Sequence, residues 1–102
     1  MTEKKYTMHN PAHPGKVLGE LVLKDRNISI GEFAKKIKIT KIKLNNVIVG
    51  RSSITPDIAV RLSVVLGTSI DLWLNMQNAY DKYQAQKKLD QKKIKLEPLQ
   101  VL

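Results

Sequence analysis

The chain has 102 residues, the length of one small domain, and its 42% hydrophobic and 26% charged residues exclude a disordered chain. Its 18 Lys and Arg exceed its 9 Asp and Glu, so the net charge of +9 favours a polyanionic partner, with nucleic acid ahead of an anionic membrane. The absence of cysteine excludes a disulfide framework and cysteine nucleophiles. No apolar run approaches the roughly 18 residues of a membrane span, which predicts a cytoplasmic protein without a membrane partner.

The N-terminal part is expected to form an arm followed by a first helix. Residues 1–13 form the extended arm, because two prolines bias the residues before them away from helix. The first helix begins at Pro14 and ends near Asn27. Its expected apolar stripe consists of Val17, Leu18, Leu21 and Val22.

Two short helices joined by a tight turn are predicted over residues 30–49. Ser29 and Glu32 form a capping-box pattern before the first of them, and Thr40 is the expected N-cap of the second, which runs to about Val49 and is closed by Gly50. So short a turn requires a left-handed residue, and we expect Lys38 to be that residue.

A fourth helix is predicted from Pro56, with Thr55 as its N-cap and Gly67 after its last turn. Its expected inward stripe is formed by Ile58, Ala59, Leu62, Val65 and Leu66.

A fifth helix, capped by Thr68 or Ser69, is expected to run to about residue 85. Its apolar residues cover more than one stripe, so some are expected to pack in the core and others against a second subunit, in preference to stacking on bases. The candidate dimer-interface residues are Trp73, Met76, Tyr80 and Tyr83.

The predicted fold is therefore an all-α domain of five helices over residues 14–85, with a helix-turn-helix at about 30–49, followed by a Lys-rich tail over 86–102. In the second helix of that unit, successive residues are rotated by about 100°, which places Ile42 and Asn46 opposite the apolar residues that are expected to face the core. Asn can bond adenine at two atoms, Ile can contact a thymine methyl group, and Lys can reach guanine or phosphate. The candidate DNA-binding residues are Thr40, Lys41, Ile42, Lys43, Asn45, Asn46 and Arg51.

Charge supports this interpretation, because residues 35–51 contain six basic residues and no acidic one. A basic face that is merely solvated is the alternative. His9 and His13 are a poor metal site, since prolines interrupt the helix that would align them and no third ligand lies near. The carboxylates form no pair typical of catalysis, and no glycine-rich phosphate loop is present, so we expect no enzyme, metal or cofactor.

Several short motifs occur in a fixed order between residues 13 and 83. They are His13-Pro14-Gly15, the helix-turn-helix of 30–49, Gly50-Arg51, Ile54-Thr55, Ala59-x-Arg61-Leu62, Leu66-Gly67-Thr68 and Trp73-Leu74-x-x-Gln77-x-x-Tyr80-Asp81. The set resembles the HigA/VapI-type antitoxins, a branch of the lambda-repressor-like (XRE-type) helix-turn-helix regulators. The resemblance implies a five-helix DNA-binding domain that dimerises, represses its own operon and neutralises a HigB-like ribonuclease toxin.

The chain departs from that family's pattern at three positions. Lys38 stands where relatives commonly have Gly in the turn, and Lys16 stands where they have Glu. Ile30 stands where they often place a phosphate-binding Gln, so Thr40 and Arg51 are the better phosphate candidates.

Two other functions remain open at this stage: a stand-alone transcriptional regulator without a toxin, and an interaction module for an acidic protein. The Lys-rich tail is expected to contact DNA, to contact the toxin, or to stay solvated and mobile.

Overall fold

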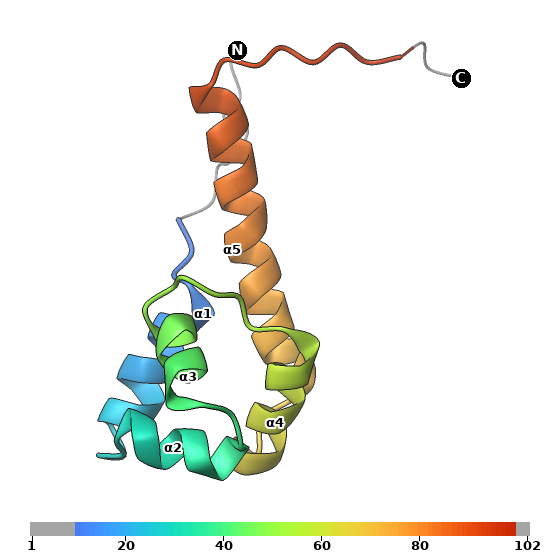
Figure 1. Ribbon diagram of the computed structural model, residues 1–102. Coiled ribbons are helices and arrows are strands. Elements are labelled where there is room, and N and C mark those ends of the chain that lie inside the picture. The colour runs from blue at the N-terminus through green and yellow to red at the C-terminus, as the bar shows by residue number, and fades with distance from the viewer. Residues whose placement is uncertain (1–9, 100–102) are drawn as a thin grey trace.

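The computed structural model describes residues 10–99, and these residues form an all-α structure with no strand (Figure 1). The helices are α1 (Pro14–Val17), the π-helix η1 (Leu18–Lys24), α2 (Ile30–Ile37), α3 (Lys41–Ile48), α4 (Pro56–Leu66) and α5 (Ile70–Gln91). Because η1 continues α1, the predicted five-helix fold class is confirmed. The expectations for the arm at residues 1–9 and for the tail at 100–102 lie outside the described residues.

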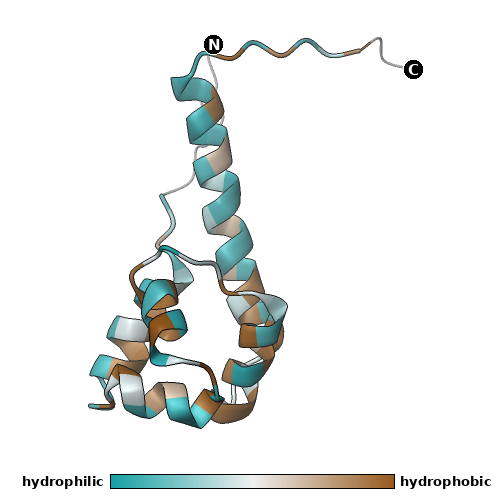
Figure 2. Ribbon diagram, in the orientation of Figure 1, coloured by the Kyte–Doolittle hydropathy of each residue, from teal (hydrophilic) through white to brown (hydrophobic). Residues whose placement is uncertain are grey.

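Helices α1 to α4, with η1 between α1 and α2, and the start of α5 enclose the core, while the second half of α5 projects from this body (Figure 1). The described chain measures 52 × 26 × 22 Å along its principal axes. Figure 2 shows the apolar residues concentrated on the inner sides of the helices around the core. The buried apolar residues are Leu18, Leu23, Phe33, Ala34, Ile37, Leu44, Val47, Ile54, Ile58, Ala59, Leu62 and Trp73.

The first helix differs from the prediction in its winding. Only its first turn is α-helical, and its second part, η1, is a π-helix. The wider i→i+5 winding changes which residues share a face. An apolar stripe that is predicted with the α-helical period therefore contains the wrong residues. Leu18 is buried as expected, but Leu21 is 69% exposed and Leu23 takes the inward position.

The helix-turn-helix has the expected local structure. Ser29 Oγ accepts a hydrogen bond from the backbone N–H of Glu32 (3.1 Å), and Glu32 Oε1 accepts one from the backbone N–H of Ser29 (3.4 Å), which completes the capping box. Thr40 Oγ1 accepts from the backbone N–H of Lys43 (3.0 Å) at the start of α3. Lys38 has φ 60° and ψ 45°, so the predicted left-handed turn residue is confirmed.

Helices α4 and α5 have the expected N-caps, with Ser69 rather than Thr68 capping α5. Val65 is 39% exposed, so the predicted inward stripe of α4 was too wide. Helix α5 continues past residue 85 to Gln91, because the Lys, Gln and Leu residues there favour helix despite the change in composition. Neither α5 nor any other helix within residues 10–99 is long and apolar enough to cross a membrane.

The left-handed conformation of Lys38 predicts a specific order of stabilities. The free energy of unfolding of Lys38→Gly should exceed that of Lys38→Ala by about 1 kcal/mol, because only glycine adopts a positive φ without a steric cost. Both variants lose the same charge, so the comparison isolates the backbone. Urea denaturation of the two proteins measures the difference, and equal stabilities would contradict the role assigned to the turn.

Candidate nucleic-acid interface

Helix α3 presents one buried face and one exposed face. Leu44 and Val47 are fully buried, whereas Ile42 is 76% exposed. Lys41 and Lys43 are also exposed beside Ile42. The buried and exposed positions of these five residues therefore agree with the predicted orientation of α3. The exposed side carries one apolar side chain beside two cations.

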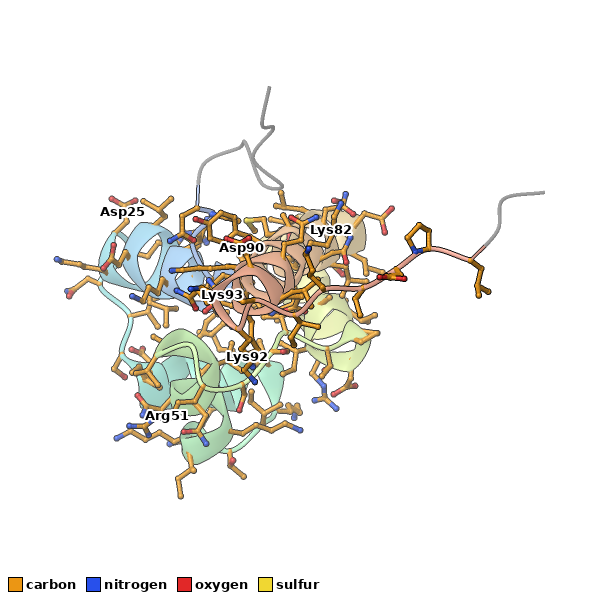
Figure 3. All side chains as sticks on the ribbon, turned by 90° about the horizontal axis from the view of Figure 1, so that it is seen from above. Asp25, Arg51, Lys82, Asp90, Lys92 and Lys93 are labelled. Atoms are coloured by element: carbon orange, nitrogen blue, oxygen red, sulfur yellow. The ribbon has the colours of Figure 1, made fainter. Side chains whose placement is uncertain are left out.

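Asn45 and Asn46 are half-buried rather than fully exposed. The chain after α3 folds back over this end of the helix, where the carbonyl oxygen of Asn46 accepts hydrogen bonds from the backbone N–H groups of Arg51 (2.8 Å) and Ser52 (3.1 Å). These bonds bring Arg51, which is exposed and labelled in Figure 3, next to the C-terminal half of α3. Arg51 is thus the candidate residue of the following loop that the structure places beside α3.

The two candidate phosphate-binding residues lie at opposite ends of α3. Thr40 uses its hydroxyl oxygen as the acceptor of the helix cap, which leaves the hydroxyl hydrogen available for a phosphate oxygen. Arg51 follows Gly50, whose φ of 85° ends the helix with a left-handed turn. A DNA backbone on either side of an inserted α3 would meet one of them.

Two glycines set how closely the first helix approaches α3. A Cβ atom on Gly15 would collide with the carbonyl oxygen of Val47, and one on Gly19 would lie 2.9 Å from Cγ2 of Ile48. The backbone of α1 and η1 therefore rests directly on the C-terminal end of α3. This contact gives a physical reason for the glycine in the His13-Pro14-Gly15 motif.

His13 holds this contact together. Its Nδ1 accepts a hydrogen bond from the backbone N–H of Gly15 (2.9 Å), and its ring meets the ring of Tyr80 edge-on, with centroids 4.9 Å apart. Burial lowers the pKa of His13, with Lys16 acting in the same direction, while Asp81 and a hydrogen bond with the backbone of Ser52 oppose the shift. Residues 10–99 contain no group of three or more side chains able to hold a metal ion, and His9 lies outside that range.

The motif in α5 ties the loop after α3 to the rest of the domain. Gln77, buried in the first half of α5, accepts a hydrogen bond from the backbone N–H of Ile54 at Oε1 (2.8 Å) and donates one from Nε2 to Asp81 Oδ1 (3.0 Å). Trp73 Nε1 donates to Thr68 Oγ1 (2.7 Å). Sequence reasoning assigned Gln77 no role beyond its place in the motif, although a glutamine on a buried helix face indicates a polar partner.

The candidate dimer residues separate into two groups. Trp73 is only 2% exposed, so its side chain belongs to the core of one chain and has almost no surface to offer a second. Met76, Tyr80 and Tyr83 are half-buried, and their place in an interface stays a prediction.

The structure adds residues of α4 to the exposed apolar surface that the sequence predicted on the fifth helix. Its members lie on the outer side of α4 and at the start of α5 and are each 39–77% exposed: Val60, Val64, Val65, Ile70 and Leu72. Figure 2 shows these two helix segments meeting at one corner of the molecule. The sequence signal was that α4 carries valines outside its inward stripe, so it is apolar on more than one side.

Comparison with known proteins assigns the chain to a family. The helix-turn-helix family model matches residues 20–73, and the chain belongs to this family. Over 83 residues it is 37% identical to an uncharacterized HTH-type transcriptional regulator, YddM, of Escherichia coli K12, and the match covers 81% of this chain and 87% of the relative.

Solved structures of two antitoxins are also similar. A structure of antitoxin GraA in complex with its operator has a TM-score of 0.81 and 30% identity, covering 97% of this chain and all of the other. Antitoxin HigA of Pseudomonas aeruginosa, solved with the higBA promoter, has a TM-score of 0.80 and 28% identity, covering 88% of this chain and 99% of the other.

Because His13 is buried, we expect acid to destabilise the domain. Because its pKa is lower in the folded chain, the unfolded chain binds more protons below the unfolded value of about 6.5, and the free energy of unfolding falls as the pH drops. His13→Asn keeps an oxygen that can cap α1 but does not titrate. Between about pH 7.5 and about pH 5, thermal unfolding should show a larger loss of Tm for the wild type than for His13→Asn. Equal losses would show that His13 contributes nothing to the pH dependence.

Proposed function

We propose that this protein is a DNA-binding antitoxin that represses its own operon and neutralises a HigB-like ribonuclease toxin. The observation that carries the DNA-binding part is the exposed side of α3, where Ile42 is flanked by Lys41 and Lys43 above a buried face. An exposed large apolar side chain between two cations suits the floor of a major groove, which offers thymine methyl groups and is lined by phosphates. Relatives with this fold have been solved with operator or promoter DNA.

In this proposal, Lys41, Ile42, Lys43, Asn45 and Asn46 contact bases or adjacent phosphates, while Thr40 and Arg51 bind the backbone. These two roles follow from the positions of the residues. Helix α3 would enter the groove, whereas Thr40 and Arg51 lie at its two ends, next to the DNA backbone. A repressor must be in the same compartment as its operator DNA, which agrees with the expected cytoplasmic location.

The proposed repressor is a symmetric homodimer. The exposed apolar surface of α4 and the start of α5 gives a second copy more surface than Met76, Tyr80 and Tyr83 alone, and its burial would remove large apolar side chains from water. Two copies of α3 would then lie about 34–36 Å apart, one turn of DNA, on a roughly palindromic operator.

The toxin-binding part of the proposal rests on the family resemblance and on the names of related proteins, which include an addiction module antidote protein of a HigA family from Coxiella burnetii. The 37% identity to a protein named as a transcriptional regulator keeps a second candidate, a stand-alone regulator without a toxin. Both candidates use the same DNA interface, so a toxin experiment separates them.

Base-reading and backbone-binding residues should respond differently to substitution. Asn46→Ala should weaken binding to the operator by about 1–3 kcal/mol and leave binding to random DNA unchanged. Arg51→Ala should weaken both and lower the salt slope of binding by about one unit, because one phosphate contact is lost. Fluorescence anisotropy over a range of salt concentrations, with DNA from upstream of the coding sequence, measures both effects.

Asn78→Ala is the matched control, since Asn78 is exposed on α5, away from α3. Thermal unfolding of each variant checks that half-buried Asn46 does not affect DNA binding through stability. If Asn46→Ala weakened operator and random DNA equally, the assigned orientation of α3 would be wrong.

Co-expression tests the antitoxin proposal. The protein should form a stable complex with the product of the adjacent gene and restore growth that this product alone arrests. A double variant, Lys41→Ala with Asn46→Ala, should lose operator binding but keep the rescue, because it leaves the buried residues Leu44 and Val47 of α3 unchanged. Truncation after Gln91 removes residues 92–102, the part of the tail that follows α5, so loss of rescue in that variant would assign toxin contact to those residues. A harmless neighbour, or no complex at micromolar concentration, would favour the stand-alone regulator.

A further inference from the structure

We infer that Arg61, on α4, is a positioning residue for the recognition helix, because it holds the turn between α2 and α3 in its left-handed conformation. This inference rests on the proposed DNA-binding function of α3. Arg61 lies outside the helix-turn-helix and outside the proposed DNA interface, so it would influence DNA binding without touching DNA.

The geometry joins three segments through one guanidinium group. Arg61 Nη1 donates hydrogen bonds to the carbonyl oxygens of Ile37 (2.8 Å) and Lys38 (3.1 Å), and Arg61 Nε donates to Asp57 Oδ2 (3.0 Å). The salt bridge with Asp57, one turn earlier on α4, orients the guanidinium toward the turn. The side chain is therefore held at one end by its own helix and at the other by the turn.

The two carbonyl oxygens need a donor from outside the helix. Helix α2 ends at Ile37, and the backbone N–H groups of Lys38 and Ile39 return to the carbonyls of Lys35 and Ala34. The oxygens of Ile37 and Lys38 follow these bonded carbonyls, at the negative end of the helix dipole, where a cation is favourable. The left-handed conformation of Lys38 brings its carbonyl beside that of Ile37, so one nitrogen of Arg61 reaches both.

The same contact offsets the strain at Lys38. A left-handed conformation is sterically unfavourable for any residue other than glycine. Without Arg61, the turn would exchange with conformations in which Lys38 has a negative φ and α3 begins in a different direction. The C-terminal end of α3 is fixed by Gly15 against Val47, so Arg61 supplies the restraint at the N-terminal end.

Hydrogen exchange tests the restraint without DNA. In Arg61→Gln, the hydrogen-bonded backbone amides of Lys38 and Ile39 should exchange about tenfold faster than in the wild type, while the amides of α5 keep their rates. Arg26→Gln is the matched control, because Arg26 is exposed and precedes α2, so it removes the same charge away from the turn. Unchanged exchange in the turn of Arg61→Gln would overturn the inference whatever the protein binds.

DNA binding tests the consequence for α3. Arg61→Gln should lower operator affinity by about tenfold but random-DNA affinity by only about twofold, the same loss as in Arg26→Gln, because nonspecific binding depends on charge and not on helix direction. Arg61→Lys keeps the charge but has no planar group to bridge the carboxylate and both carbonyls, so it should also lose operator affinity. If Arg61→Gln lowered the affinity for operator and random DNA equally, Arg61 would contribute only its charge, and the inference would be overturned.

A double variant separates positioning from stability. Adding Lys38→Gly to Arg61→Gln should recover most of the operator affinity, because glycine adopts the left-handed conformation without help. If Arg61→Gln does not fold, Arg61→Lys with and without Lys38→Gly gives the same comparison. No recovery in a folded double variant would count against the inference. Absence of DNA binding in the wild type would instead refute the proposed function, and the exchange experiment would still decide the role of Arg61.

Discussion

The close contact between Gly15 and the carbonyl oxygen of Val47 is the constraint on which the arrangement of this domain depends. It fixes the distance between α1 and α3, and no side chain larger than hydrogen fits there. His13 keeps the chain in this position by capping α1, and the ring of Tyr80 meets the ring of His13 edge-on. One contact thus connects the beginning of the domain, the recognition helix and α5.

The loop after α3 depends on the same region. Gln77 binds the backbone of Ile54 from inside α5, and Asp81 holds the amide group of Gln77. Arg51, which the loop carries, therefore has its position set by buried polar contacts rather than by its own side chain. Burying a glutamine is costly unless its polar atoms are paired, and both ends of Gln77 are. The motif of α5 is thus a support for the proposed DNA interface.

The sequence predicted the helix-turn-helix well because its signals are local. Ser29, Glu32 and Thr40 act within a few residues of their own position, and Lys38 follows from the shortness of the turn. The π-helical winding of η1 and the role of Arg61 were not predictable in this way. Both depend on packing between segments far apart in sequence: Gly19 approaches Ile48, and Arg61 reaches carbonyls 23 and 24 residues away.

The candidate surfaces leave distinct parts of the domain for its proposed partners. DNA is assigned to the outer side of α3, and a second copy to the exposed apolar residues of α4 and early α5. A toxin bound while the dimer stays on DNA must then contact neither of these surfaces. Exposed parts that remain include η1, where Leu21 is 69% exposed, and the projecting second half of α5. Because α5 also carries Tyr80 and Gln77, a partner on its projecting half would act on the helix that supports α3 and its following loop.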